Sequence, residues 1–360
     1  MCDTAEEEIR TRILRSVPAG GRAQAVEVLQ GLANDETCLR HFCAAVLALL
    51  DQGKLRTEDP LGNKTPAELM SVRLQFVPSN APPPKAVAPG LVYFPDRLLG
   101  RSTAALVYRG EDKRSGKPIA VKIFEIQGSP APELLAWHLE RFRQEPCLMA
   151  RLNHPHVVEV VAWGELDDGP WYAMELLDGG TLSQRITRER RLPAEDVRAC
   201  FRAVASALGA GARLGISHRD VKPGNIFTQG WKLADFGMAK VSLGAEAKGA
   251  ARSITSHGAR LGTPAYMAPE RAAYGSGDVR SDIYSLGATM YHAATGRFLF
   301  PAGTDDAKSW AHHHINTAPP PVADRAPGLP PALCDLIMRC LAKSPADRPP
   351  TFDAVIEALS

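Results

Sequence analysis

The sequence lacks the features that mark a membrane or secreted protein. Its longest apolar run, residues 42–50, is nine residues long, whereas a helix that crosses a bilayer needs about 20 apolar residues. The N-terminus, MCDTAEEEIR, is acidic where a secretory signal would be basic, and no apolar core follows it. We therefore expect a soluble, cytoplasmic protein without a membrane partner.

Cysteine is scarce and unpatterned, and charge of neither sign predominates. The seven cysteines form no Cys-x-x-Cys pair, which argues against a zinc site or a disulfide framework and favours thiols in a reducing compartment. Lys and Arg number 42 against 40 Asp and Glu. The resulting net charge of +2 argues against nucleic acid as a partner bound through bulk charge.

The chain of 360 residues is long enough for two domains, or for one large domain with an extension. Residues 1–77 carry apolar positions at helical spacing, such as Ile9 and Ile13. The capping box Thr65-Pro66-Ala67-Glu68 predicts a further helix through Leu74. We expect a small all-α module that docks a partner, dimerises, binds back on the rest of the chain or only packs as an extension. Five prolines in residues 78–90 then predict an extended linker.

The most informative stretch is 218–237, HRDVKPGNIFTQGWKLADFG. Phosphoryl transfer needs a positioned nucleophile, cations that neutralise phosphate oxygens and carboxylates that hold those cations. Pro223 and Gly224 predict a tight loop, so Asp220 would sit on a rigid turn and accept a proton from an incoming hydroxyl. Lys222 would then lie within reach of the transferred phosphate. The stretch therefore predicts a phosphoryl-transfer site.

Two further residues of this stretch can hold a metal ion. Asn225 and Asp235 offer the oxygen atoms that Mg²⁺ prefers. The segment between them predicts a β-hairpin that turns at Gln229-Gly230 and brings the two ligands close together.

With these residues in place, the sequence resembles the protein kinases, most closely the serine/threonine kinases of bacteria. His218-Arg219-Asp220, then Asn225, then Asp235-Phe236-Gly237 match the catalytic-loop and metal-loop motifs of that family in order and spacing. The resemblance implies an α+β, two-lobed fold with a small antiparallel-sheet N-lobe containing one main helix, and a mostly helical C-lobe. It places the lobes at 91–173 and 181–360, joined by a hinge at 174–180. It also implies ATP and Mg²⁺, with Mn²⁺ as an alternative cation.

The resemblance extends upstream to the nucleotide-binding strands, with one departure. Where the family has three glycines, this chain has Gly100, Ser102 and Ala105. Glycine allows close approach of the backbone to phosphates, so we expect ATP binding to be weakened or the loop to be stiffened, and not abolished. The remaining nucleotide contacts that the resemblance implies are Val107 and Ala120 at the adenine and Lys122 at the α- and β-phosphates.

A helix between 133 and 152 carries the glutamate that pairs with the strand lysine in related proteins. Its offset from Asn153 implies that Glu145 is the partner of Lys122, with Glu140 as the rival candidate. Pro146 would kink this helix and let Glu145 swing. In the hinge, the resemblance implies that the adenine and ribose contact Met174, Glu175, Leu177 and Asp178.

Residues 238–266 are rich in small and polar residues and are expected to become ordered when phosphorylated, through Arg219. The candidate acceptors are Ser253, Thr255 and Ser256. The segment ends in GTPAYMAPE, which resembles a peptide-positioning loop in which Thr263 contacts Asp220 and Lys222. Lys222 and Thr263 together favour Ser or Thr over Tyr as the acceptor.

Three further features have structural interpretations. The resemblance implies that Glu270 pairs with Arg348 and that Asp282 braces the backbone of the catalytic loop. Adjacent histidines on a helix point in different directions. His312, His313 and His314 therefore cannot easily share one metal ion. We expect them to form a solvated helix face and not a metal site.

The leading hypothesis is a protein serine/threonine kinase that transfers the γ-phosphate of ATP to protein substrates and phosphorylates its own activation segment. Its catalytic set is Asp220, Lys222, Lys122, Glu145 and Thr263. A scaffold without efficient catalysis is the alternative, supported by the depleted glycine loop and Pro146. A small-molecule phosphotransferase is disfavoured because such proteins lack a GTPAYMAPE-like loop.

Overall fold

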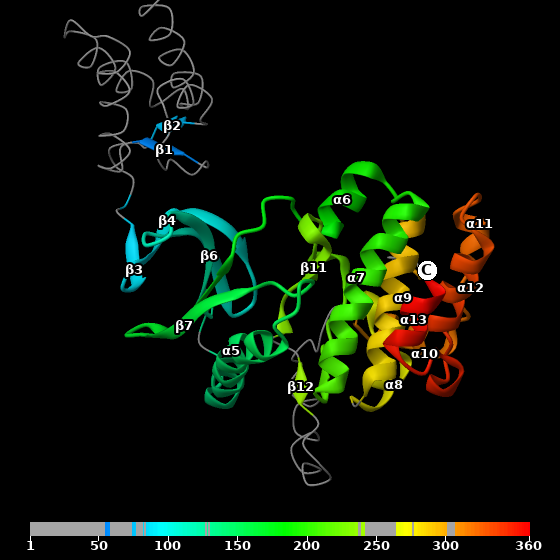
Figure 1. The fold of residues 1–360 in the computed structure, drawn as a ribbon. Coiled ribbons are helices and arrows are strands. Elements are labelled where there is room, and N and C mark those ends of the chain that lie inside the picture. Colours follow the sequence, from blue (N-terminus) through cyan, green and yellow to red (C-terminus); the bar gives the residue numbers. More distant parts are fainter. Residues whose placement is uncertain are drawn as a thin grey trace, which may run out of the picture. The chain divides into compact units, whose positions relative to one another are not determined.

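The computed structural model describes residues 55–57, 74–76, 82, 84–126, 128, 130–236, 239–241, 264–275, 277–300 and 307–360. The chain divides into two compact units. The first comprises residues 1–128 and 164–176, and the second comprises residues 129–163 and 177–360 (Figure 1).

A six-stranded antiparallel sheet carries most of the first unit, in the order β3-β4-β5-β6-β8-β7. Its strands are β3 (Lys85–Ala88), β4 (Leu91–Arg101), β5 (Ala105–Asp112), β6 (Lys117–Phe124), β7 (Val160–Leu166) and β8 (Gly169–Glu175). A hairpin joins β5 and β6. Asp112 fixes its turn by accepting hydrogen bonds from Arg114 N (3.1 Å) and Ser115 Oγ (2.9 Å). Ile119 and Val121 are buried in β6, which is typical of a central strand.

The second unit is mostly helical, as Figure 1 shows. Its helices are α5 (Pro132–Leu152), α6 (Leu182–Glu189), α7 (Ala194–Arg213), α8 (Pro269–Tyr274), α9 (Val279–Thr295), α10 (Ala307–Asn316), α11 (Val322–Arg325), α12 (Pro331–Cys340) and α13 (Phe352–Ala358). Short strands form two pairs, β10 (Ile226–Phe227) with β11 (Lys232–Leu233), and β9 (Ile216–Ser217) with β12 (Lys240–Val241).

Helix α9 forms the core of this unit, packing against α7 and α12. It is buried almost along its whole length, and Tyr284, Leu286 and Met290 are fully enclosed. The helix begins at Asp278, whose carboxylate accepts from Arg280 N at 2.9 Å. It ends at Gly296, in the left-handed region at φ 68°, where a Cβ would lie 2.0 Å from Arg190 O. Only glycine fits this end of the helix.

Two predictions near the N-terminus need correction. A helix through Leu74 is wrong, because Leu74–Phe76 forms β2 and pairs antiparallel with β1 (Leu55–Thr57). Leu74-Gln75-Phe76 alternates apolar and polar residues, which is a strand pattern, and Pro78 follows closely. The remainder of the all-α prediction for 1–77 lies outside the described residues. Within the predicted linker 78–90, the run Lys85–Ala88 joins the sheet as β3 because Val87 is apolar and buried.

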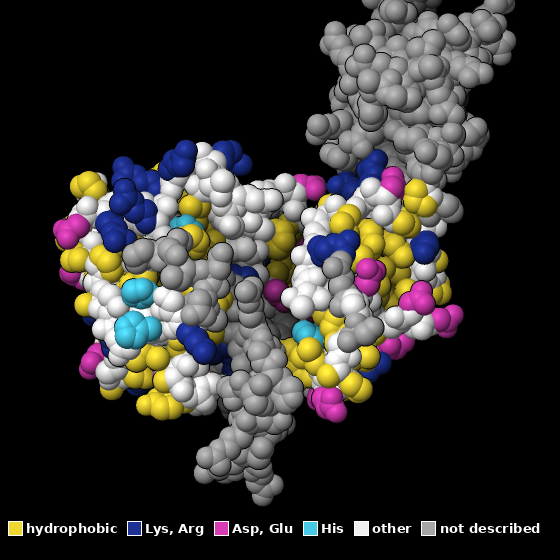
Figure 2. Space-filling model, turned by 180° about the vertical axis from the view of Figure 1, so that it is seen from behind, with side chains coloured by type: hydrophobic (Ala, Val, Ile, Leu, Met, Phe, Trp, Pro, Cys, Tyr) yellow, Lys and Arg dark blue, Asp and Glu magenta, His cyan; other side chains and the backbone are white. Residues whose placement is uncertain are grey.

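Among the described residues, no helix combines the length and the apolar content that crossing a bilayer requires. Lys and Arg side chains are interspersed with Asp and Glu on the face seen in Figure 2, in keeping with the small net charge.

Candidate active site

The turn that follows β9 gathers three of the predicted site residues. A 3₁₀ turn at Pro223–Asn225 folds the chain back, as the Pro-Gly pair predicted. Lys222 Nζ donates to Asp220 Oδ2 at 2.6 Å. Asn225 Nδ2 donates to the backbone oxygen of Asp220 at 2.8 Å and to Oδ2 at 3.2 Å. A carboxylate, an ammonium and an amide thus converge, and only 8% of Asp220 is exposed.

Asp282 of α9 holds the backbone of this turn, as the resemblance implied. Its two carboxylate oxygens accept from His218 N at 2.7 Å and from Arg219 N at 2.8 Å. Arg219 has a left-handed backbone at φ 69°, which costs free energy in a non-glycine residue and persists only when its surroundings fix it. Burial raises the pKa of Asp282, while the nearby His218 and the Arg219 backbone N–H oppose that rise.

The predicted hairpin supplies the second arm of the site. Strands β10 and β11 pair antiparallel, with the turn at 229–231, and Ala234 N donates to Asn225 O at 2.9 Å. His218 contacts the same strand end, with its Nε2 3.1 Å from Ala234 O. Asn225 and Asp235 therefore lie on neighbouring backbone segments, as predicted. Asp235 is also left-handed, at φ 64°.

The donor set of this site fits a hard divalent cation. Asn225 uses its amide nitrogen on Asp220, so the carbonyl oxygen is the atom it can offer to a cation. Asp235 carries a carboxylate and directly follows Ala234, whose backbone N–H donates to Asn225 O. No cluster of three or more His, Cys, Asp or Glu residues suited to a metal occurs in the described part of the chain. Mg²⁺ matches this arrangement because it is bound through one or two carboxylates and completed by substrate phosphates.

The nucleotide-contact residues predicted for the first unit are neighbours in its sheet. Val107 is the register partner of Lys122, and Ala120 is the partner of Met174. Lys122 Nζ lies 5.3 Å from the centroid of the Tyr172 ring. This cation–π contact joins Lys122 of β6 to its register partner on the neighbouring strand β8.

The loop between β4 and β5 shows what replaces its missing glycines. The backbone N–H of Ser102 donates to Ala105 O at 2.8 Å, and the Ser102 hydroxyl lies 3.3 Å from the same oxygen. Ala105 is buried and paired with Phe124. Gly100 is open, since a Cβ there would meet nothing within 4 Å. The loop therefore carries a side-chain clamp where glycines would leave it loose.

Two glutamates were candidates for the lysine partner, and the structure distinguishes them. Glu145 is 2% exposed on α5. Glu140 is exposed and accepts from Gln144 Nε2 at 3.0 Å. Burial thus favours Glu145, whose pairing with Lys122 stays a prediction. Pro146 lies inside α5, which continues to Leu152.

The remaining predicted residues are placed as follows. Glu175 ends β8, and Leu177 and Asp178 follow it, with Asp178 N donating to Gln229 Oε1 at 3.0 Å. Thr263 and the candidate acceptors lie outside the described residues: Ser253, Thr255 and Ser256.

Sequence reasoning missed a cluster of three arginines in the second unit. After burial, which is the main cause, the charges of Arg219 and Arg271 lower the pKa of Arg141 to about 10, and the charge of Arg271 lowers the pKa of Arg219. The carboxylates of Asp282, Asp220 and Glu270 oppose the fall in the pKa of Arg271. Arg271 also donates to the backbone oxygen of Arg219. The buried Arg219 Nε has no hydrogen-bond partner among the described residues. The sequence analysis named Arg219 alone as a phosphate contact. Arg141 and Arg271 are far from it in the chain, and no spacing in the sequence indicates that they join it.

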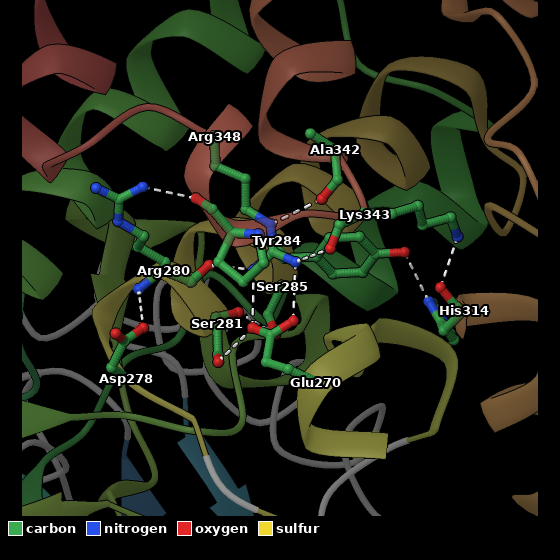
Figure 3. Close-up of polar contacts among 11 residues, drawn as sticks. Glu270, Asp278, Arg280, Ser281, Tyr284, Ser285, His314, Ala342, Lys343 and Arg348 are labelled. Carbon is green, nitrogen blue, oxygen red and sulfur yellow. Dashed lines mark hydrogen bonds and ion pairs between the residues drawn. The ribbon is translucent and has the colours of Figure 1, made fainter. Parts of the chain in front are cut away.

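A second network supports the segment after Thr263 (Figure 3). Both guanidinium nitrogens of Arg348 donate to Glu270, each at 2.8 Å, and Ser281 Oγ donates to the same carboxylate at 2.6 Å. The pairing implied by the resemblance is confirmed in this geometry. Tyr284 lies under the Arg348 guanidinium at 5.0 Å from ring centroid to Cζ.

Comparisons with known proteins show the family of the chain. The model of the protein kinase domain family matches residues 93–358, so the chain belongs to the protein kinase family. It is similar to serine/threonine-protein kinase PknL of Mycobacterium tuberculosis, with 36% identity over 259 residues, 71% of this chain and 62% of the relative. It is also similar to serine/threonine-protein kinase pkn3 of Myxococcus xanthus, with 34% identity over 272 residues, 73% of this chain and 48% of the relative.

A third relative, serine/threonine-protein kinase PknA of Mycobacterium tuberculosis, is 36% identical over 260 residues, 70% of this chain and 57% of the relative. The chain thus spans less than two thirds of the length of these curated relatives.

Proposed function

We propose that the protein is a serine/threonine protein kinase that transfers the γ-phosphate of ATP to hydroxyl groups of protein substrates. The observation that carries the proposal is the convergence of Lys222 and Asn225 on the buried carboxylate of Asp220. The names of the relatives support the class of reaction and of acceptor. They give the alternative of a catalytically silent scaffold no support.

In this proposal, the acceptor hydroxyl attacks the γ-phosphorus in line. The new O–P bond forms as the bond from phosphorus to the β–γ bridging oxygen breaks, and ADP leaves with that electron pair. Asp220 orients the hydroxyl and takes its proton. Lys222, hydrogen-bonded to Asp220, steadies the transferred group, because catalysis here is mainly positioning and charge stabilisation.

Asn225 and Asp235 would hold the metal ion, for which we propose Mg²⁺. When bound, the ion would neutralise charge on the phosphate oxygens. Lys122 and Glu145 would fix the α- and β-phosphates, and the adenine would lie against Val107, Ala120 and Met174. Lys222 and Thr263 together favour Ser or Thr as the acceptor.

We also propose that phosphorylation between residues 242 and 263 activates the protein. The arginine cluster supports this: Asp282 and its neighbours balance the charge of Arg271 and part of that of Arg219, while the pKa of Arg141 is lowered by burial and by both arginines, so a further anion would stabilise the group. A phosphate on Ser253, Thr255 or Ser256 would supply that anion. Mass spectrometry after incubation with ATP should find phosphate in this segment, and its absence there would reject the proposal.

We propose that residues 1–77 dock a partner or bind back on the kinase domain. We also propose that the protein acts in the cytoplasm.

Transfer from labelled ATP to myelin basic protein tests the main proposal. The full chain should label the acceptor in the presence of Mg²⁺ and lose that activity in EDTA. Absence of transfer at any Mg²⁺ or Mn²⁺ concentration would leave only the family assignment.

A further inference from the structure

The peptide unit that joins Arg219 to Asp220 is held at both of its polar groups. Its N–H, on Asp220, donates to His218 Nδ1 at 3.2 Å. Its oxygen, on Arg219, accepts a hydrogen bond from Nη1 of Arg271, a residue of α8 that lies 52 positions further along the chain. The plane of the peptide unit directly before the Asp220 side chain is therefore set by two partners, and one of them comes from a distant helix.

The conformation of Arg219 makes this support necessary. Its backbone is left-handed, at φ 69°, a region that costs free energy for any residue with a side chain and persists only where the surroundings fix it. Asp282 accepts from the N–H of Arg219 at 2.8 Å, and Arg271 donates to the oxygen of the same residue. Arg219 is thus fixed from both sides, and only the contact with Asp282 was implied by the sequence.

The surroundings of Arg271 are built to hold its long side chain. Only 8% of Arg271 is exposed, and the neighbouring Glu270 is anchored by Arg348 at 2.8 Å. Gly277 packs directly on the stem of Arg271, since a Cβ at Gly277 would lie 2.7 Å from Arg271 Cγ. The oxygen of Gly277 also accepts from Arg219 Nη2 at 3.4 Å. A glycine at 277 therefore leaves the space that the Arg271 side chain needs to reach Arg219.

The charges around Arg271 agree with this placement. Burial lowers its pKa, and the carboxylates of Asp282, Asp220 and Glu270 oppose that fall. Arg271 in turn is one of the groups that oppose the rise in the pKa of the buried Asp282. Arg271 and Asp220 also line the same small pocket. A buried guanidinium is tolerated where carboxylates and hydrogen-bond acceptors surround it, as they do here.

We propose that Arg271 is a positioning residue for the transfer step: it fixes the peptide unit before Asp220 and so keeps the Asp220 carboxylate in the orientation that takes the proton of the acceptor. This inference rests on the proposed kinase function and deepens it by a residue to which none of the predicted site motifs gives a role. Because Arg271 acts through Asp220 and not on the nucleotide, its removal should lower kcat and leave KM for ATP unchanged.

The test compares R271M with wild type in the full chain, using labelled ATP and myelin basic protein. Methionine keeps an unbranched side chain and removes the charge and every donor. We expect kcat to fall roughly ten- to hundredfold, the worth of one hydrogen bond from a charged donor. KM for ATP should stay near the wild-type value. The rates are compared at a temperature where circular dichroism shows both proteins to be folded.

The matched control is R280M. Arg280 Nη1 donates to the backbone oxygen of Pro345 at 2.7 Å, a bond of the same kind that involves no residue of the catalytic turn. R280M should lower the melting temperature and leave kcat at the wild-type value. If R280M lowers kcat as much as R271M does, the loss in R271M reflects stability alone and the inference is overturned.

A double-mutant cycle tests whether Arg271 acts through Asp220. Two residues that act as one unit give effects that do not multiply. R271M should therefore cost little further kcat in a D220N background, where residue 220 can no longer take a proton. R271K retains a charged donor, so its kcat should lie between those of R271M and wild type. If R271M does not fold, R271K and D220N/R271K complete the same cycle.

The inference is also overturned if R271M has the wild-type kcat, or if the full loss recurs in the D220N background. Failure of the kinase function itself would appear differently, as a wild-type chain that transfers no phosphate to the acceptor.

Discussion

Arg348 makes a two-pronged ion pair with Glu270 across 78 residues of sequence, with both nitrogen–oxygen distances at 2.8 Å. The Arg348 side chain is fully buried, and its other hydrogen bonds go to the backbone oxygens of Arg280, Ala342 and Lys343. Burial opposes ionisation of Glu270, but hydrogen bonds from Arg348 and Ser281 outweigh it, so the pKa of Glu270 is lowered. The pair anchors the start of α8, directly after the turn at 264–266.

Removing one member of this pair should destabilise the protein strongly. R348M leaves the Glu270 carboxylate without its partner and frees three backbone oxygens, and we expect the free energy of unfolding to fall by about 3 kcal/mol or more. Urea unfolding followed by circular dichroism measures this change. The matched control is R213M, which breaks the exposed pair with Asp353 at 3.7 Å. It should cost less than about 1 kcal/mol. Equal effects of the two variants would contradict the account.

The clamp in the nucleotide loop should be measurable through ATP kinetics. S102G removes the hydroxyl that lies 3.3 Å from Ala105 O and restores a glycine, so the backbone can approach phosphates more closely. We expect KM for ATP to fall about two- to fivefold, equivalent to part of one hydrogen bond. The acceptor KM should not change, because Ser102 lies in the nucleotide loop. A higher KM for ATP in S102G would show that the clamp assists binding.

Gly100 provides the complementary variant. Because a Cβ there meets nothing within 4 Å, G100A should leave the melting temperature nearly unchanged. It should nevertheless raise KM for ATP if the backbone at this residue approaches the phosphates. If KM for ATP in G100A equals that of wild type, the phosphates of ATP do not lie close to this residue.

The parts of the site that could be predicted from sequence are those whose residues lie close together in the chain. Asp220, Lys222 and Asn225 lie within one turn, so their spacing already defined their geometry. The hairpin that brings Asp235 beside them is equally local. Glu270 and Arg348 are far apart in the chain and could be paired only through the family resemblance.

Residues brought together by tertiary packing alone were missed. Arg141, Arg219 and Arg271 come from three separate elements, and none of their spacings indicates a cluster. All three histidines of 312–314 were predicted to be solvated. Three consecutive helical residues point in three directions, however, and His314 faces the core. In residues 74–76 a short strand was taken for the end of a helix, because three residues are too few to establish a period.

Acid should weaken the protein through two buried histidines. Burial lowers the pKa of His292 to about 4 and that of His314 to about 3, against 6.5 in an unfolded chain. Between these limits the unfolded state binds more protons, so the free energy of unfolding should fall as the pH drops below about 6.5. The slope is at most about 1.4 kcal/mol per pH unit for each group.

Urea unfolding between about pH 7 and about pH 5 measures that slope. The slope should be shallower in H314F, which lacks one of the two groups, and unchanged in H312F, whose histidine is exposed. A slope in H314F equal to that of wild type would contradict the assignment of His314 as a neutral buried group.

The most direct test of the central claim is the rate of phosphate transfer from labelled ATP to myelin basic protein by the full chain and by D220N. Asparagine keeps the shape of Asp220 and cannot take the acceptor's proton. The account predicts a loss of about 10²-fold or more in kcat, the usual contribution of a positioned base, with KM for ATP little changed. A D220N protein that transfers phosphate at the wild-type rate would contradict it.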